Sequence, residues 1–196
     1  MSKKILVIKS SPRGYNSQSN LLVNTLVGKF KDATVTTRDV SAGIPFVTET
    51  MIGAFYSNPE THNDSQKQAV TVSNELVKEV LDNDIIIIGS PLYNFSIPAA
   101  LKAYIDLIVR VGITFKYGET GQFVPLVHGK KAYVVLATGG ASIGSPYDGA
   151  SSYLKTILGF IGITEVEVLG VSGTSIPEIA ETAIKTAKEN IEALAI

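Results

Sequence analysis

The chain alternates between short runs of apolar residues and longer stretches in which apolar residues recur with helical spacing. A short unbroken apolar run is typical of a strand buried on both faces of a sheet, whereas apolar residues three and four positions apart indicate an amphipathic helix. The sequence predicts strands over residues 5–8, 33–40, 85–88, 132–137 and 166–171. It predicts helices over residues 21–30, 66–81, 98–111, 151–160 and 176–194.

This alternation predicts the α/β class, with helices covering both faces of a parallel sheet. Five strands joined by right-handed crossovers most simply give a flavodoxin-like three-layer sandwich with the strand order 2-1-3-4-5. The strand at 33–40 alternates in polarity, so we expect it at an edge with one wetter face. The chain has no internal repeat, linker or low-complexity tract, and residues 1–196 are expected to form a single domain.

Two predicted connections are longer than a compact fold requires. Residues 41–64 are mostly irregular and partly apolar, and residues 114–129 contain Phe115, Tyr117 and Phe123 among several glycines. Long connections of this kind are usually functional loops or surfaces that face a partner. Exposed apolar residues on them favour oligomerisation over a lid that covers a ligand.

Composition narrows the chemistry that these elements can carry. The 196 residues have a formal net charge of −1, so we expect no nucleic-acid partner. No apolar run is long enough for a secretory signal or a membrane span, and we expect a cytoplasmic protein without membrane contact. The chain has no cysteine, which excludes thiolate metal sites and dithiol redox chemistry. Any redox activity would therefore need a cofactor.

The loop after the first predicted strand is rich in hydroxyl groups and leads into a helix. Ser10 follows the strand, and Ser17, Gln18 and Ser19 lie at the expected helix start. The free amides and positive dipole end of a helix N-terminus favour an anion. The loop has neither the glycine pattern of a dinucleotide site nor a Walker loop, so a monophosphate fits better. Ser17 could equally be an ordinary helix N-cap.

The loop after the third predicted strand carries two aromatic rings and an amide. It reads Pro91-Leu92-Tyr93-Asn94-Phe95, and Pro98 then opens the next helix. Loops at the carboxyl ends of parallel strands are where ligands bind in open α/β sheets, and aromatic faces there suit a flat, conjugated ligand. As an alternative, Tyr93 and Phe95 could simply cover the edge of the sheet.

The loop after the fourth predicted strand is dominated by small residues. It begins Ala137-Thr138-Gly139-Gly140. Glycine lets backbone amides approach a ligand, here the polar edge of a heterocycle, although a flexible turn has the same composition.

Residues 140–144 in this loop also match the G-x-S-x-G pattern of a serine nucleophile. We reject a hydrolase because His62 and His128 both precede Ser142, and because the serine lies too far beyond the strand for a sharp turn. Neither histidine has the spacing of a metal ligand, so no metal site is expected.

The carboxyl ends of parallel strands lie at one edge of a sheet, so these three loops should converge on one crevice. Their hydroxyls, aromatic rings and glycine backbone suit a mononucleotide with a flat ring, such as flavin mononucleotide (FMN). The chain also resembles the FMN-dependent NADH-azoreductases, which are flavodoxin-like quinone reductases. The matching segments are Lys9-Ser10-Ser11, Ser17-Gln18-Ser19-Asn20, Pro91-Leu92-Tyr93-Asn94-Phe95, residues 101–117 and Leu158-Gly159-Phe160-Ile161-Gly162-Ile163-Thr164.

The resemblance implies an enzyme that carries two electrons from NADH through tightly bound FMN to quinones and aromatic azo compounds, which are cleaved to amines. A ping-pong cycle is implied, because donor and acceptor use the same face of the flavin. No side chain is expected to be catalytic, since the hydride transfer belongs to FMN, with Asn94 near its reactive edge.

The same resemblance implies a set of contacts. The FMN phosphate would be bound by Ser10 and residues 17–19, the flavin ring by residues 91–95, and its polar edge by residues 137–140. The substrate mouth would contain four aromatic residues, namely Phe115, Tyr117, Phe123 and Phe160. The family is homodimeric with its site at the subunit boundary, so a homodimer is expected.

Three residues depart from the family pattern, which commonly has Met in place of Leu92 and Ser-Arg in place of Ala137-Thr138. Leucine for methionine is nearly neutral in volume. Loss of the arginine could alter the flavin potential or the pocket mouth.

The main alternative is a flavodoxin-type electron carrier without a substrate of its own. Such carriers are usually strongly acidic, whereas this chain is nearly neutral. A nucleotide-binding regulator without catalysis is a third possibility, which the aromatic residues on the third loop disfavour.

Overall fold

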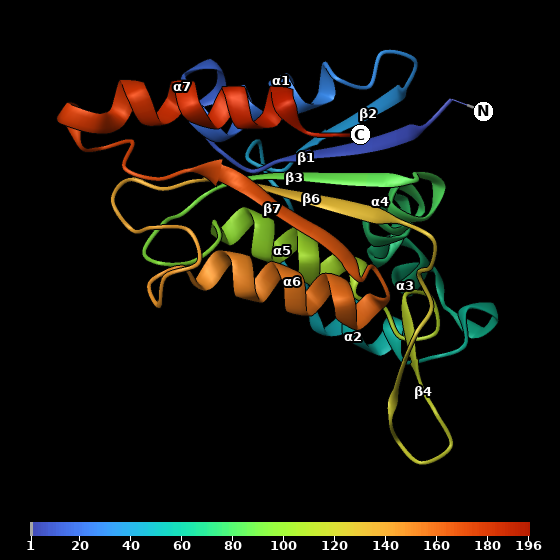
Figure 1. The fold of residues 1–196 in the computed structure, drawn as a ribbon. Coiled ribbons are helices and arrows are strands. Elements are labelled where there is room, and N and C mark those ends of the chain that lie inside the picture. The colour runs from blue at the N-terminus through green and yellow to red at the C-terminus, as the bar shows by residue number, and fades with distance from the viewer. Residues whose placement is uncertain (1) are drawn as a thin grey trace.

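The computed structural model describes residues 2–196, and its centre is a sheet with helices on both faces (Figure 1). The strands of this sheet are β1 (Lys4–Lys9), β2 (Thr34–Asp39), β3 (Ile85–Pro91), β6 (Lys131–Ala137) and β7 (Glu165–Val171). All are parallel and stand in the order β2-β1-β3-β6-β7, which is the pattern 2-1-3-4-5 expected from the sequence.

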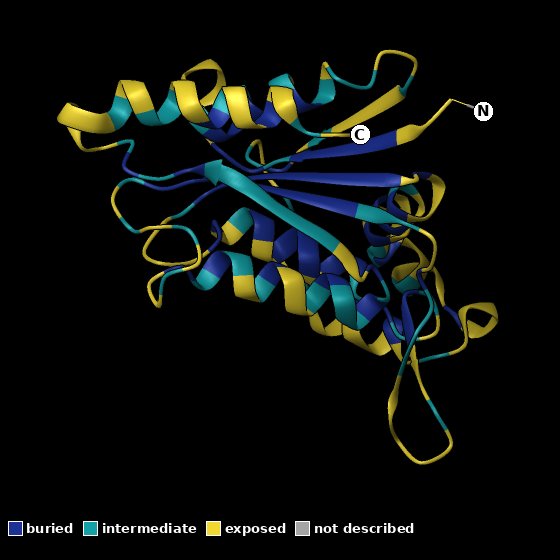
Figure 2. Ribbon diagram, in the orientation of Figure 1, coloured by how far each residue is buried: buried dark blue, intermediate teal, exposed yellow. Residues whose placement is uncertain are grey.

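The helices form two layers, one on each face of the sheet. One layer contains α1 (Gln18–Val27) and α7 (Pro177–Ala193), and the other contains α4 (Thr71–Asp82), α5 (Ala99–Ile108) and α6 (Gly149–Ile161). Successive strand residues face opposite layers, so Leu6 and Ile86 pack with the second layer, and Val7 and Ile87 with the first. Figure 2 shows the central strands buried between the layers.

The structure differs from the sequence prediction in the element boundaries. The helix expected over residues 66–81 is two helices, α3 (Asp64–Ala69) and α4, which are separated by a turn at Val70. Pro98 is the N-cap of α5 and lies just outside the helix. β2 is an edge strand as expected, but most of its residues are exposed on both faces.

The two long connections contain regular structure. Residues 41–64 include α2 (Glu49–Phe55), which begins where Thr48 Oγ1 accepts a hydrogen bond from Met51 N, and the short helix η2 (Pro59–Thr61). Residues 114–129 form an antiparallel hairpin of β4 (Phe115–Tyr117) and β5 (Phe123–Pro125). The expectation that residues 41–64 are mostly irregular was therefore only partly correct.

The hairpin lies at the edge of the sheet where the strands begin. Val127 N, just after β5, donates to Ile161 O at the end of α6 at 2.9 Å, and β7 begins shortly after that point. Since α5 and α6 run antiparallel to the strands, their ends lie away from the carboxyl ends of β3 and β6 (Figure 1). Within residues 2–196, no helix combines the length and apolar character needed to cross a membrane.

Candidate functional site

The loops after β1, β3 and β6 share one edge of the sheet, because these three strands are parallel neighbours. Ser10 N donates to Gly89 O at 3.1 Å, and Ser10 Oγ donates to the same carbonyl at 2.9 Å. Leu92 N donates to Ala137 O at 2.9 Å. Hydrogen bonds thus connect the first loop with β3 and the loop after β3 with the end of β6, so these loops leave one edge of the sheet. That they form one ligand crevice stays a prediction.

The start of α1 carries more polar groups than the protein itself satisfies. Ser17 is the N-cap, and its Oγ accepts from Asn20 N at 3.2 Å and lies 3.0 Å from Ser19 Oγ. Gln18 Oε1 and Asn20 Oδ1 are buried without a hydrogen-bond partner. Leaving such a group unsatisfied costs about 1–3 kcal/mol, so a ligand that donates hydrogen bonds here would be stabilised. The ordinary N-cap is present, but it leaves these atoms unused.

The loop after β3 contains a strained turn. Tyr93 N donates to Ser96 O at 2.9 Å and Ser96 N donates to Tyr93 O at 3.0 Å, which closes a two-residue turn. Its central residues, Asn94 with φ 49° and Phe95 with φ 65°, are the only non-glycine residues with positive φ in the described part of the chain. A left-handed conformation costs roughly 1–2 kcal/mol for an L-residue. Strain of this kind persists where a function depends on the geometry.

The aromatic rings of this turn are partly open to solvent. Phe95 is 61% exposed and Tyr93 is 38% exposed. Phe95 therefore does not cover the sheet edge, which was the alternative interpretation of this loop. An exposed aromatic ring on a strained turn offers a surface for a flat ligand.

A groove of about 670 Å³ lies directly beside the turn. Tyr93, Asn94 and Pro98 line one part of it, and Lys102 and Tyr153 line another. Lys102 Nζ donates to Asp106 Oδ1 at 2.6 Å, and this hydrogen bond raises the pKa of the lysine above its ordinary value. The groove thus combines two aromatic side chains with a cation that is charged at neutral pH.

The loop after β6 is supported by the segment that follows β7, which the sequence did not indicate. Thr174 N donates to Thr138 O and Ser175 N donates to Gly139 O, both at 3.0 Å. A Cβ at Gly139 would lie 2.8 Å from Ser175 Oγ, so a larger residue there would displace the Ser175 side chain. A Cβ at Gly140 would meet nothing within 4 Å, so its backbone faces open space.

Two residues beside the turn escaped the sequence prediction. The Tyr147 ring lies 5.5 Å from the Phe95 ring, measured between centroids, and Gly149 N donates to Phe95 O at 3.1 Å. Tyr147 could have been found as a lone aromatic residue in a loop of small residues. Gly149 carries no local signal, because its importance comes from a residue distant in sequence.

The rejected hydrolase site also has no support in the structure. Ser142 is exposed in the loop between β6 and α6, away from a sharp strand–helix turn. His62 is buried, and its Nε2 lies 3.0 Å from Ala54 O, so it packs within the fold. His128 is exposed before β6.

The four aromatic residues expected at the substrate mouth form one cluster. The ring centroid of Phe160 lies 4.7 Å from that of Phe115 and 5.0 Å from that of Phe123. The ring centroids of Tyr117 and Phe123 are 5.6 Å apart. They line a groove of about 440 Å³ together with Phe55 and other residues of the first long connection. Phe115 is buried at its base, whereas Tyr117 and Phe123 are exposed.

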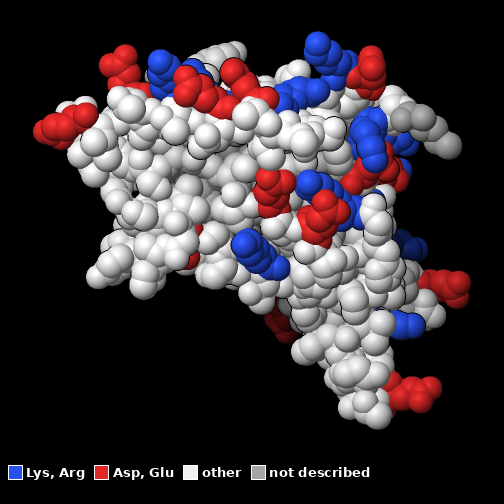
Figure 3. All heavy atoms as spheres, viewed as in Figure 1, with Lys and Arg blue, Asp and Glu red and all other residues white. Residues whose placement is uncertain are grey.

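This aromatic groove does not meet the other predicted site residues within one chain. It lies with the β4–β5 hairpin at the amino edge of the sheet, opposite the loops after β1, β3 and β6 (Figure 1). On the face drawn in Figure 3, charged side chains gather over α7 and near the amino edge, a cationic side chain stands over α6, and the loops at the carboxyl edge are almost free of charge. The protein thus has two candidate surfaces at opposite ends.

Comparisons with known proteins identify the family of this fold. Residues 3–195 match a family model described as a flavodoxin-like fold. An FMN-dependent NADH:quinone oxidoreductase of Burkholderia pseudomallei is 40% identical over 196 residues, covering 97% of this chain and 98% of its own length. A protein of the same name from Hahella chejuensis is 46% identical over 83% of this chain and 81% of its own length.

A solved structure is similar over nearly the whole fold. An azoreductase from Bacillus anthracis superposes with a TM-score of 0.87 at 29% sequence identity, covering 96% of each chain. The resemblance stated from the sequence is therefore confirmed. This chain belongs to the flavodoxin-like family of FMN-dependent NADH:quinone oxidoreductases.

Proposed function

We propose that this protein is an FMN-dependent NADH:quinone oxidoreductase that also reduces aromatic azo compounds. The observation that carries the proposal is the strained Tyr93–Ser96 turn, which holds an exposed aromatic ring at the same sheet edge as the polar start of α1. The relatives with this activity in their names match the chain almost end to end, which supports the proposal.

The residues at this edge fit the chemistry of FMN. The phosphate would be held at the start of α1 by the hydroxyl and backbone N–H groups of residues 17–19, with Ser10 beside them, because the helix dipole favours an anion there. The unpartnered Gln18 Oε1 and Asn20 Oδ1 only accept hydrogen bonds, so they would face a donor group of the ligand and not its phosphate. Residues 91–95 would flank the flavin ring, and residues 137–140 would offer backbone groups to its polar edge. Each group of contacts comes from a different loop of the one edge.

When bound, FMN supplies the redox chemistry: hydride uptake from NADH and hydride delivery to a quinone or azo acceptor. The work of this chain is to bind and orient the reactants and to exclude water. Asn94 would lie near the reactive edge of the flavin. Thr138 stands where the family commonly has Arg, and its buried hydroxyl donates to Ala141 O, so this loop position carries no cation.

The experiment uses the purified protein as isolated. We expect a yellow protein with a flavin spectrum, whose absorbance bleaches on anaerobic mixing with NADH and recovers on addition of a benzoquinone. Steady-state NADH oxidation should require the quinone. A protein that binds FMN but shows no turnover would support the electron-carrier alternative, and a colourless protein that does not quench FMN fluorescence would exclude both functions.

We further infer a homodimer in which the aromatic groove of one copy completes the site of the other. The support is that the aromatic groove and the flavin loops lie at opposite edges of one chain, so only a second copy could join them. The nearly uncharged surface of the carboxyl-edge loops has a character suited to an interface (Figure 3).

A further inference from the structure

We infer that Asp148 and Gly149 are positioning residues, which hold the Tyr93–Ser96 turn in its strained conformation by fixing it to the start of α6. The inference rests on the proposed function, because the turn is proposed to flank the flavin. It assigns a role to two residues that neither the resemblance nor the site motifs indicated.

The first part of the arrangement is the Asp148 carboxylate, which is 5% exposed and uses both oxygens. Oδ1 accepts from Ala150 N at 3.1 Å and from Ser151 N at 2.9 Å, which caps α6. Oδ2 accepts from Gly144 N at 2.8 Å and from Ser151 Oγ at 2.6 Å. One side chain therefore fixes the loop after β6 to the first turn of the following helix.

The second part is the contact between that helix and the turn. Gly149 is the first residue of α6, and its N donates to Phe95 O at 3.1 Å. A Cβ on residue 149 would lie 2.5 Å from this carbonyl oxygen, closer than packing allows, so only glycine permits the hydrogen bond. The carbonyl belongs to the residue with φ 65°, whose strained conformation needs an external restraint.

Together these contacts make the loops after β3 and β6 one unit. The carboxylate sets the position of the helix start, the helix start holds Phe95 O, and Phe95 presents its ring beside Tyr147. If the restraint is lost, the turn can relax toward negative φ and move the Phe95 ring. The cofactor would then lose an aligned wall without losing any residue that touches it.

Gly149→Ala separates this role from helix stability. Alanine is a better helix former than glycine by about 1 kcal/mol, so α6 itself should not be weakened. We expect FMN to dissociate from the holoprotein roughly tenfold faster, measured by the recovery of FMN fluorescence after dilution. The matched control is Gly159→Ala in the same helix, whose Cβ meets nothing within 4 Å and which should leave the dissociation rate unchanged.

Asp148→Asn tests the other half of the restraint. Asparagine keeps one oxygen that can cap α6. Its NH2 group replaces Asp148 Oδ2 and cannot accept the hydrogen bonds from Gly144 N and Ser151 Oγ. We expect faster FMN release and a shifted flavin absorption spectrum. Asn63→Ala, which removes the N-cap of α3, is the control for the loss of a cap alone and should change the melting temperature but neither flavin readout.

The outcomes distinguish the two proposals. If the wild-type protein binds no FMN, the proposed function fails. If the wild type binds FMN and both Gly149→Ala and Asp148→Asn release it at the wild-type rate with an unchanged spectrum, the positioning role is wrong and the proposed function stands. If Gly159→Ala and Asn63→Ala alter release as strongly as the two test variants, the effect is general destabilisation and the inference is also overturned.

Discussion

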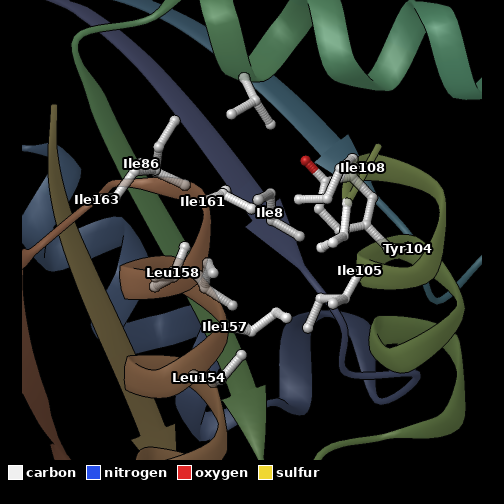
Figure 4. Close-up of a pocket in the computed structure, with 13 residues that line it drawn as sticks. Ile8, Ile86, Tyr104, Ile105, Ile108, Leu154, Ile157, Leu158, Ile161 and Ile163 are labelled. Carbon is white, nitrogen blue, oxygen red and sulfur yellow. The ribbon is translucent and has the colours of Figure 1, made fainter. Parts of the chain in front are cut away.

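Tyr104 places a phenol hydroxyl inside the apolar layer between the sheet and its covering helices. The residue is fully buried, and its hydroxyl has no hydrogen-bond partner among the described residues. Burial raises the pKa of this hydroxyl well above its ordinary value. Figure 4 shows the apolar side chains around it, including Ile8, Ile86 and Ile108, which line a cavity of about 10 Å³. A water molecule there would lack the two to four polar partners that it needs.

We therefore expect Tyr104→Phe to raise the free energy of unfolding by about 1 kcal/mol, because it removes an unsatisfied polar group and keeps the ring. Urea unfolding followed by circular dichroism measures the change. Tyr133→Phe is the control: the Lys131 ammonium lies 4.7 Å from the centroid of that ring, and the Tyr133 hydroxyl is not a buried unpartnered group, so its removal should not raise stability. A loss of stability in Tyr104→Phe would mean that the hydroxyl has a partner.

Asp148 makes stability depend on pH. Its burial acts to raise the pKa of the carboxyl group, but the hydrogen bonds from Ser151, Gly144 and Ala150 outweigh burial and leave the pKa below its ordinary value. The stabilisation is therefore fully present above the unfolded-state pKa of about 3.9 and is lost as the pH falls through the lower folded-state value.

The expected result is a difference in unfolding free energy between wild type and Asp148→Asn that is constant from pH 7 to about pH 5 and shrinks below about pH 4. Urea unfolding across this range measures it. A difference that grows on acidification would contradict the lowered pKa.

At the scale of the element, the turn between β3 and α5 has a strained backbone that lowers stability but fixes the position of an aromatic ring. Tyr93 and Ser96 close it, and the two central residues adopt positive φ without being glycine. Natural two-residue turns of this shape favour Asn-Gly, so Asn94 is ordinary there and Phe95 is not. Phe95 places an aromatic ring at this strained position, whereas glycine would relieve the strain but has no ring.

Phe95→Gly should therefore separate stability from cofactor binding. We expect the free energy of unfolding to rise by about 1 kcal/mol as the strain is relieved, since the ring is mostly exposed. We expect FMN binding to weaken roughly threefold to tenfold through loss of ring stacking. Urea unfolding and fluorescence titration test the two effects. Asn94→Gly, which keeps the ring, is the comparison and should bind FMN more tightly than Phe95→Gly.

At the scale of the whole molecule, the sheet separates two surfaces. The loops after β1, β3 and β6 leave its carboxyl edge, and the aromatic β4–β5 hairpin leaves its amino edge. The helices α5 and α6 span the distance between them. A site that uses both surfaces needs two chains in a head-to-tail or symmetric contact, and two-fold dimers are by far the commonest solution.

Light scattering after size-exclusion chromatography should give twice the mass of one chain. Phe123→Ala should lower kcat/KM for a benzoquinone while FMN release stays at the wild-type rate, because the residue is distant from the flavin loops of its own chain. A monomer with full activity would contradict the shared site. So would a Phe123→Ala variant that releases FMN faster by the same factor by which its kcat/KM falls.

Much of this could be predicted from local patterns. The strands at 5–8 and 85–88 are continuous apolar runs, which only a sheet covered on both faces can bury. Their parallel arrangement follows from the helices between them, and with it the convergence of the three loops. The break between α3 and α4 at Val70 could not be predicted, because the apolar repeat continues through it.

The sequence by itself determined the fold class, the strand order and the loops that carry the candidate site, because periodicity and strand–loop–helix spacing are properties of neighbouring residues. Only the tertiary structure decided that Gly149 holds Phe95 O and that the aromatic hairpin lies at the far edge of the sheet. Those facts depend on the direction of α5 and α6 and on contacts between residues far apart in the chain. No local pattern encodes such contacts, because packing fixes them after the elements have formed.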